Sequence, residues 1–236
     1  MINYAHRGAS EYAPENTLSS FYLGLLQGAN GIETDVRKTK DGVLILFHDD
    51  TLDRVTDAVG RVDEFTWEEL KKVKVYGSCT TGFFDRIVTL REFLEAFSQY
   101  EIHFAIELKG ADSEAQTLEL AREFGIMEKT TFTSFSFAYI QKMKELDPTA
   151  RVGWLTSDVS DEAIERLLAI GGEEMAPKAS TVTEDLMKKW RDAGLGVRAW
   201  GVTSIDLMKQ MCRLGVDGMT VNFPDRLKQY VSQPVS

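Results

Sequence analysis

A histidine and an arginine stand side by side near the start of the chain, in the stretch MINYAHRGASEYAPENT. The imidazole of His6 can exchange a proton near neutral pH, and Arg7 carries a permanent positive charge. Both residues end a short apolar run that is typical of a strand, and a loop and a helix are predicted to follow. This placement indicates that the first strand of the fold carries part of a reaction site.

Carboxylates occupy the ends of two further predicted strands. Glu33 and Asp35 are two residues apart, so their side chains point to the same side of a strand and repel each other unless a cation lies between them. Glu107 and Lys109 repeat this spacing in the stretch FAIELKG. Three acidic oxygen donors without a cysteine predict a hard divalent cation, Mg²⁺ or Ca²⁺, rather than structural zinc.

His48 ends a predicted hairpin strand and supplies a second imidazole beside His6. Two histidines near a cation suggest a general acid and a general base, and Arg7 and Lys109 add fixed positive charge for an anionic group. These groups suit a phosphodiester, since one histidine can take a proton from the nucleophile while the other gives one to the leaving oxygen. The cation and Lys109 would offset negative charge on the phosphoryl oxygens. A pair such as Glu107 and Lys109 alone is more typical of a salt bridge.

The chain alternates short β-rich runs with longer stretches of helical period, an arrangement that would bring these residues together. Eight strands are predicted at 2–6, 31–36, 103–108, 130–135, 151–156, 173–178, 196–202 and 217–223. Helices are predicted at 16–29, 89–100, 113–125, 136–146, 161–171, 183–194 and 204–215, and a last one near Pro224. Residues typical of helix N-caps begin several of them: Asn16, Ser113, Asp161, Thr183 and Ser204.

Repeated strand–helix alternation favours parallel strands joined by crossover helices. Eight such units in 236 residues predict a closed (β/α)₈ TIM barrel, whose strands end on the face where barrel enzymes keep their reaction sites. A doubly wound open sheet is the main alternative, but the chain has no Gly-rich dinucleotide motif to support it. Residues 38–88 interrupt the rhythm as a small insertion after the second barrel strand, beginning with a hairpin that turns at Asp41 and Gly42. We expect a single domain over 1–236.

The composition excludes several classes of partner. The formal net charge is −10 and the sequence pI is about 4.9, which disfavours nucleic acid and anionic membrane surfaces but permits a small anionic substrate. No apolar run is long enough for a membrane anchor, and no signal peptide is visible. Cys79 and Cys212 share no spacing motif and are expected to be reduced thiols. A cytoplasmic enzyme is predicted; a homodimer is compatible with the sequence.

The ordered motifs are similar to those of the glycerophosphodiester phosphodiesterase family. The chain contains HRG and PENT (6–8 and 14–17), ETD (33–35), HDDTLDRVT (48–56) and IELK (106–109), followed by VGWL (152–155), RAWGV (198–202) and DGMTVNFPD (217–225). Each motif is weak alone, but the set covers nearly the whole chain in the family's order.

The resemblance implies a TIM barrel that hydrolyses glycerophosphodiesters, such as glycerophosphocholine or glycerophosphoethanolamine, to sn-glycerol 3-phosphate and an alcohol. It also implies a role for each matching residue. The acid/base pair would be His6 and His48, and the metal ligands would be Glu33, Asp35 and Glu107. Arg7 and Lys109 would be the cations beside the phosphate, and Trp200 would be the aromatic side chain against the glycerol carbons. Glu15 and Asn16 would support Arg7 and the first loop.

Three positions depart from the family pattern: Val55 replaces a threonine, Asn222 replaces an aspartate, and Gly201 follows Trp200 in place of a threonine. Two alternative functions fit similar residues. One is a phospholipase-D-like lysolipid lyase, for which only Phe83, Phe84 and Ile87 offer an apolar rim. The other is a barrel that binds a phosphodiester or a metal without turnover. The sequence leaves open the head group, the metal (Mn²⁺ included), which histidine is the base, and whether water or the glycerol 2-hydroxyl attacks.

Overall fold

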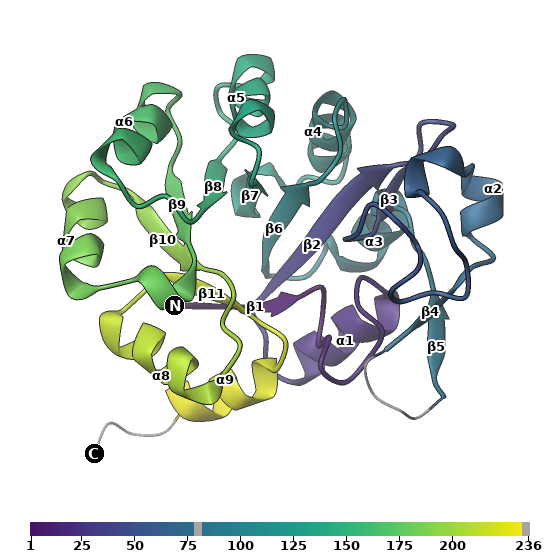
Figure 1. Ribbon diagram of the computed structural model, residues 1–236, viewed down its shortest axis with the longest axis horizontal. Coiled ribbons are helices and arrows are strands. Elements are labelled where there is room, and N and C mark those ends of the chain that lie inside the picture. Colours follow the sequence, from purple (N-terminus) through teal and green to yellow (C-terminus); the bar gives the residue numbers. More distant parts are fainter. Residues whose placement is uncertain (78–81, 233–236) are drawn as a thin grey trace.

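The computed structural model describes residues 1–77 and 82–232 as a closed barrel of eight parallel strands with helices around it (Figure 1). The first strand pairs with both the second and the last, which closes the ring. The barrel strands are β1 Ile2–His6, β2 Gly31–Lys38, β6 His103–Leu108, β7 Thr130–Ser134, β8 Val152–Thr156, β9 Glu174–Pro177, β10 Gly196–Ala199 and β11 Gly218–Val221. The predicted TIM barrel is confirmed, and each predicted strand corresponds to one of these eight.

The helices between the strands are shorter than predicted at several ends. They are α1 Leu18–Leu26, α3 Leu90–Phe97, α4 Glu114–Glu123, α5 Phe137–Leu146, α6 Asp161–Ala169, α7 Glu184–Asp192, α8 Ile205–Leu214 and α9 Pro224–Val231. The short 3₁₀ turns Met127–Lys129 and Ala179–Thr181 also belong to the connections.

Two of the predicted N-caps are wrong. Thr17 rather than Asn16 caps α1, and Ser160 rather than Asp161 caps α6, because each hydroxyl accepts a hydrogen bond from the backbone N–H three residues later. Ser113 is the N-cap residue of α4, as predicted, although its side chain makes no capping hydrogen bond. The caps predicted at Thr183 and Ser204 are confirmed.

The insertion after β2 forms a small subassembly beside the barrel, at the right of Figure 1. It contains β3 Leu44–Leu46, the 3₁₀ turn Val62–Glu64, α2 Trp67–Leu70, β4 Lys74–Tyr76 and β5 Phe84–Arg86. The predicted hairpin is confirmed, since β3 pairs antiparallel with β2 and Gly42 adopts a positive φ of 86° in the turn. His48 does not end that strand, however; it follows β3 by two residues. The single-domain interpretation stays a prediction.

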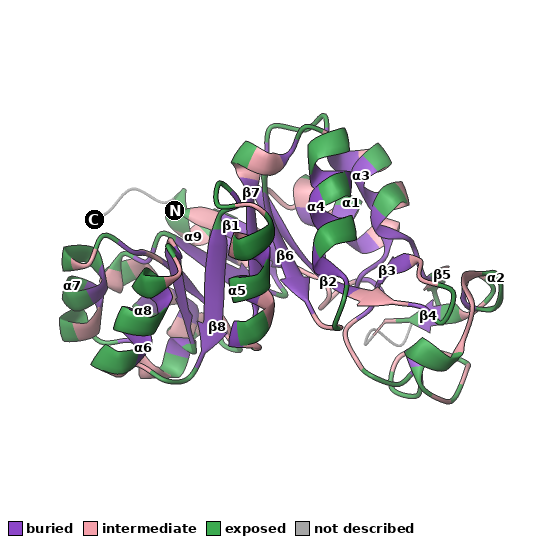
Figure 2. Cartoon of the chain, turned by 90° about the horizontal axis from the view of Figure 1, so that it is seen from above, coloured by how far each residue is buried: buried purple, intermediate pink, exposed green. Residues whose placement is uncertain are grey.

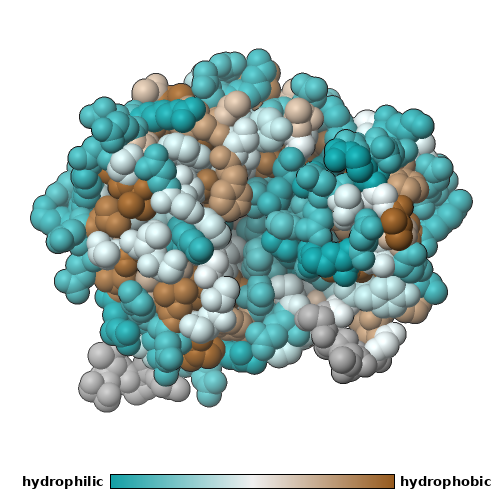
Figure 3. Space-filling model, in the orientation of Figure 1, coloured by the Kyte–Doolittle hydropathy of each residue, from teal (hydrophilic) through white to brown (hydrophobic). Residues whose placement is uncertain are grey.

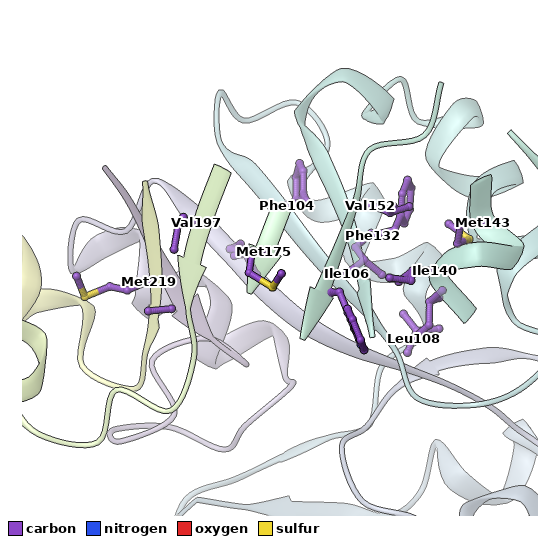
Figure 4. Close-up of a cluster of buried hydrophobic side chains, with 14 of the residues drawn as sticks. Phe104, Ile106, Leu108, Phe132, Ile140, Met143, Val152, Met175, Val197 and Met219 are labelled. Atoms are coloured by element: carbon purple, nitrogen blue, oxygen red, sulfur yellow. The ribbon is translucent and has the colours of Figure 1, made fainter. Parts of the chain in front are cut away.

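Alternation along the strands separates the core from the barrel interior. Phe104, Ile106 and Leu108 of β6 are buried in the main hydrophobic cluster together with Phe132 of β7 and Val197 of β10 (Figure 4). The barrel strands are buried over most of their length, whereas the outer faces of the helices are exposed (Figure 2). Residues of opposite parity, such as Glu33, Glu107 and Arg198, therefore project into the barrel.

Cys212 is half-buried and free of any disulfide among the described residues, and Cys79 lies outside them. No helix in the described ranges is both long and apolar enough to cross a bilayer.

Candidate active site

A pocket opens where the barrel strands end, and it collects most of the residues that the sequence singled out. Its volume is about 260 Å³, and Figure 3 shows a hollow near the middle of the face, with hydrophilic residues on its right and paler to brown, more apolar ones on its left. Seven predicted site residues line it: His6, Arg7, Glu33, His48, Glu107, Lys109 and Trp200. Asp35 is fully buried next to them, while Glu15 and Asn16 support the site from the loop after β1.

Three buried carboxylates form the centre of the site. Asp35 and Glu107 are direct neighbours across the β2–β6 pairing, and Glu33 precedes Asp35 by two residues on the same face. Carboxylate oxygens of all three lie within 4.8 Å of one another. Burial and the neighbouring charge of Asp35 raise the pKa of Glu33 and of Glu107. Burial also disfavours the charged form of Asp35, but Arg7 and Lys109 prevail and lower its pKa.

The donor set fits a hard divalent cation. It offers only carboxylate oxygens, as Mg²⁺ and Ca²⁺ prefer. The atom Asp35 Oδ1 is buried and accepts no hydrogen bond from the described residues; its nearby cation, Lys109 Nζ, lies 3.5 Å away. A buried acceptor without a hydrogen bond and two acids with raised pKa values are what a missing positive charge would produce. The cluster can therefore hold a metal ion.

Two basic side chains flank the carboxylates on opposite sides. Arg7 Nε lies 3.0 Å from Asp35 Oδ2, and its Nη1 donates to Glu15 Oε1 at 2.9 Å. Lys109 Nζ donates to Glu107 Oε1 at 2.7 Å. Because Arg7 and Lys109 both line the pocket, they leave positive charge facing any bound anion.

The loop after β1 holds this arrangement in a strained backbone. Arg7 and Asn16 have positive φ angles of 55° and 56°, which side chains other than glycine rarely adopt. The Asn16 side chain donates to Asp35 Oδ2 at 2.9 Å and accepts from Thr34 Oγ1 at 2.8 Å. Asn16 therefore positions a candidate metal ligand, while Glu15 holds Arg7 as the sequence predicted.

The two histidines have different partners. The ring nitrogen Nδ1 of His6 lies 2.6 Å from the amide oxygen of Asn222, and its Nε2 lies 3.9 Å from Glu33 Oε2. The Nδ1 of His48 lies 2.6 Å from the Asp49 carboxylate, which in turn accepts from Arg54 Nε at 2.5 Å. Loss of hydration lowers the pKa of both rings, that of His6 to about 4, with Arg7 adding to the effect. Each Nδ1–H donates to an oxygen, so each Nε2 carries the lone pair in the neutral ring.

Arg54 joins the insertion to the loop after β1. It donates to Asp49 and also to both carboxylate oxygens of Glu15, at 2.9 and 2.7 Å. Glu15 thus bridges Arg54 and Arg7, and the partners of His48 are tied to those of the carboxylate cluster.

Aromatic and aliphatic side chains line the opposite wall. Phe135 and Trp200 meet edge to face with ring centroids 5.0 Å apart, and Leu155 and Val202 extend the wall. The three residues that could form an apolar rim for a lysolipid, Phe83, Phe84 and Ile87, are not among the described residues that line this pocket. Ile87 is buried in the insertion, and Phe84 packs against Tyr76.

A model described as the glycerophosphoryl diester phosphodiesterase family matches residues 6–226. The chain belongs to this family. It is 33% identical over 236 residues to a glycerophosphodiester phosphodiesterase of Bacillus altitudinis, with 94% of this chain and 95% of the relative covered. It is 31% identical over 231 residues to one from Caldanaerobacter subterraneus, with 94% of each covered. The enzyme class predicted from the sequence, a glycerophosphodiester phosphodiesterase, is confirmed.

Solved structures of the family have the same fold. The glycerophosphodiester phosphodiesterase of Agrobacterium tumefaciens superposes with a TM-score of 0.85 at 27% identity, covering 96% of this chain and 98% of the other. A phosphodiesterase of Oleispira antarctica, in complex with the product sn-glycerol-3-phosphate, also gives 0.85 at 27% identity, covering 98% and 96%.

Several site residues of this glycerophosphodiester phosphodiesterase were not predicted as such. Asp49 was missed although it directly follows His48, and a carboxylate beside a histidine was the available signal. Asn222 was noted only as a departure from the family, but it is the partner of His6. Phe135 and Arg198 line the pocket, whereas the sequence predicted no site role for either: Phe135 lies in the predicted strand 130–135, and Arg198 begins the motif RAWGV. Gly201, the other departure, also lines the pocket, with a positive φ of 69°.

Proposed function

We propose that this chain hydrolyses glycerophosphodiesters, such as glycerophosphocholine or glycerophosphoethanolamine, to sn-glycerol 3-phosphate and an alcohol, and that it needs a divalent cation to do so. The observation that carries the proposal is the cluster of three buried carboxylates in a pocket that also contains two histidines and two basic side chains. The product complex of the Oleispira antarctica relative supports the choice of product.

The ligands of the cation are Glu33, Asp35 and Glu107, and the ion is Mg²⁺ or Ca²⁺, with Mn²⁺ as a further candidate. When bound, it supplies Lewis-acid stabilisation of charge on the phosphoryl oxygens. The chain's own cations act on the same group: Arg7 and Lys109 orient the phosphodiester and stabilise the negative charge that develops on it.

His6 and His48 transfer the protons. Both Asp49 and Asn222 favour a positively charged ring by accepting from its Nδ1–H, but Asp49 adds a full negative charge beside His48, whereas the Asn222 amide beside His6 is neutral. This asymmetry favours His48 Nε2–H as the proton donor to the leaving alcohol and His6 Nε2 as the acceptor from the nucleophile. The nucleophile is water or the 2-hydroxyl of the substrate's glycerol, and His6 would act in the same way on either.

Trp200 and Phe135 form the apolar side of the substrate site, against carbon atoms of the substrate. The sequence is compatible with two further functions. The lysolipid lyase loses support because its expected rim lies outside the pocket lining, and no observation favours a barrel without turnover.

The test is release of glycerol 3-phosphate from glycerophosphocholine by the purified protein, first in EDTA and then with Mg²⁺, Ca²⁺ or Mn²⁺. Product that appears only with a metal supports the proposal and identifies a competent ion. Full activity in EDTA would contradict the metal requirement. No product with any metal, from a folded sample, would contradict the proposed function, and lysophosphatidylcholine would then be the next substrate.

A further inference from the structure

Arg198 is a charged side chain inside the barrel that the proposed chemistry does not use. It lies in the middle of β10 and is only 1% exposed, yet it lines the pocket beside Trp200 and Thr220. Its Nε donates to Glu174 Oε1 at 2.8 Å, and its Nη1 makes a long contact of 3.4 Å with Thr220 Oγ1. Its Nη2 is buried and has no hydrogen-bond partner among the described residues.

A buried guanidinium nitrogen without an acceptor is uncommon, because such a donor loses its water without a replacement. Here the guanidinium cannot turn freely to find one. Glu174 holds one edge, and the ring of Tyr4 lies 5.4 Å from its central carbon. Because Arg198 borders the pocket, a ligand bound in the pocket is a natural hydrogen-bond acceptor for its remaining N–H groups.

Charge and position indicate which part of a substrate this would be. Glu174 already neutralises Arg198, so the pair offers a donor without net attraction for an anion. Arg7 and Lys109 serve the anion at other strands. Strand β10 lies four places from β6 in the ring of eight, and thus opposite Glu107 and Lys109. Strand β1, which carries Arg7, lies two places from β10, and Arg198 is near enough to Glu33 to act on its pKa. A group that reaches Arg198 therefore extends away from Lys109, on the side of the pocket that Trp200 lines.

We propose that Arg198 determines specificity for the glycerol part of the substrate, by donating its Nη2–H to the terminal hydroxyl farthest from the phosphate. This inference rests on the proposed function. The enclosed end of the pocket would then hold the small glycerol unit that all substrates share, and the variable alcohol would leave through the open mouth. A neutral hydroxyl suits the neutralised Arg198–Glu174 pair, and Trp200 covers the adjacent carbons.

The experiment compares glycerophosphocholine with 2-hydroxypropyl phosphocholine, which keeps the hydroxyl next to the phosphate but lacks the terminal one. The wild-type protein should prefer glycerophosphocholine in kcat/KM on the order of 10–100-fold, the effect of one hydrogen bond from a charged donor. The double variant Arg198→Met/Glu174→Gln removes the buried ion pair as a unit, so no lone charge is left inside the barrel. Its preference should fall below about threefold.

Two further variants control for folding. Val197→Ala alters the neighbouring residue of β10 that faces the helices, and it should keep the wild-type preference even if it is less stable. Arg198→Lys keeps the positive charge but shortens the donor, so an intermediate preference is expected. If the double variant does not fold, the ratio of kcat/KM for the two substrates in the wild type and in Arg198→Lys still tests the role of Arg198.

The outcomes separate this inference from the function on which it rests. Equal kcat/KM for both substrates in the wild type, or a preference that survives in the double variant, would overturn the role of Arg198 while leaving the phosphodiesterase intact. If the wild type cleaves neither substrate, calorimetric titration with glycerol 3-phosphate and 2-hydroxypropyl phosphate tests Arg198 alone. Tighter binding of the former, lost in the double variant, would support it; equal binding would reject it.

Discussion

The two sides of the pocket differ in chemistry: one consists mainly of charged side chains and the other mainly of apolar ones. On the side of β1, β2 and β6, charged groups hold one another: Arg7 and Lys109 contact Asp35, and Glu15 bridges Arg7 and Arg54. On the side of β7, β8 and β10, rings and aliphatic chains form the wall, and Arg198 is the buried charge there among the lining residues. The first side is suited to move protons and stabilise charge, and the second to select a shape.

This division has a physical basis. Buried charges interact strongly, so a small change among them alters the reaction centre by several kcal/mol. Apolar contacts contribute in proportion to the area they cover, and each acts on bound substrate and transition state alike. Substitutions on the charged side should therefore lower kcat, whereas those on the aromatic side should raise KM.

The largest effect is expected for Glu107→Gln, which removes one charge from the carboxylate cluster with little change in shape. Loss of several kcal/mol of charge stabilisation corresponds to a decrease in kcat/KM of about 10³-fold or more. The apparent affinity for Mg²⁺ or Ca²⁺ should fall as well, measured by activity against metal concentration. Glu119→Gln, on the exposed face of α4, is the matched control and should behave as wild type. Unchanged metal dependence in Glu107→Gln would remove it from the ligand set.

The next effect separates the two histidines by the leaving group. His48→Ala should lower turnover of glycerophosphocholine by about 10²–10⁴-fold, because the choline oxygen needs a proton as it leaves. On the p-nitrophenyl ester of glycerol phosphate, whose phenolate leaves without a proton, the loss should be less than about tenfold. His6→Ala should lower turnover of both substrates.

His103→Ala is the control for this pair, because His103 begins β6 at the other end of the barrel and is exposed. It should leave both rates unchanged. An equal loss on both substrates in His48→Ala would mean that His48 is not the proton donor, and the roles of the two rings would have to be exchanged or shared.

The sequence predicted the charged side of the pocket better than the other side. Charges at strand ends contradict the apolar pattern of a barrel core, so His6, Glu33, Asp35 and Glu107 are visible in the sequence itself. Their partners are less visible, because tertiary structure chooses them: Asn222 meets His6 from a position 216 residues away. The aromatic wall uses residue types that are ordinary in a core, which is why Phe135 passed as one.

The fold could be predicted to a similar extent: the elements follow from the sequence, but some of their partners are chosen by the tertiary structure. Short β-rich runs between stretches of helical period identified all eight strands, because the strands of a barrel are buried and the helices have one exposed face. Helix starts were less certain, since adjacent residues can both serve as caps. Asn16 precedes Thr17, and only the structure reveals that the Asn16 amide is used by Asp35, which leaves the cap to Thr17.

A smaller effect is expected on the aromatic side. Trp200→Ala removes a large ring from the substrate wall and should raise KM for glycerophosphocholine by about tenfold, with kcat changed by less than about threefold. Trp200→Phe keeps an aromatic surface and should recover most of the loss. If Trp200→Ala lowered kcat and left KM unchanged, the proposed separation between the two sides would fail at this residue.

The smallest effect concerns stability, and it tests the charged side without measuring turnover. Glu33 and Glu107 have raised pKa values in the folded protein, in the absence of metal. Above the ordinary carboxyl pKa near 4.5, the folded state therefore holds more protons than the unfolded state, so the free energy of unfolding falls as pH rises toward and past neutrality. The lowered pKa of Asp35 acts only at more acidic pH.

A divalent cation binds the deprotonated carboxylates, so it should reverse this loss, and more strongly at higher pH. Saturating Mg²⁺ or Ca²⁺ should raise the Tm by about 5–10 °C at pH 8 relative to EDTA, and by less at pH 5.5. Thermal unfolding at the two pH values gives the comparison. Glu33→Gln/Glu107→Gln replaces both titrating groups, so the double variant should lose the metal effect and unfold in EDTA at a Tm that varies less between the two pH values. A wild-type metal shift that is equal at both pH values would mean that the cluster does not exchange protons for the cation. The charged side would then owe its stability to Arg7 and Lys109 alone.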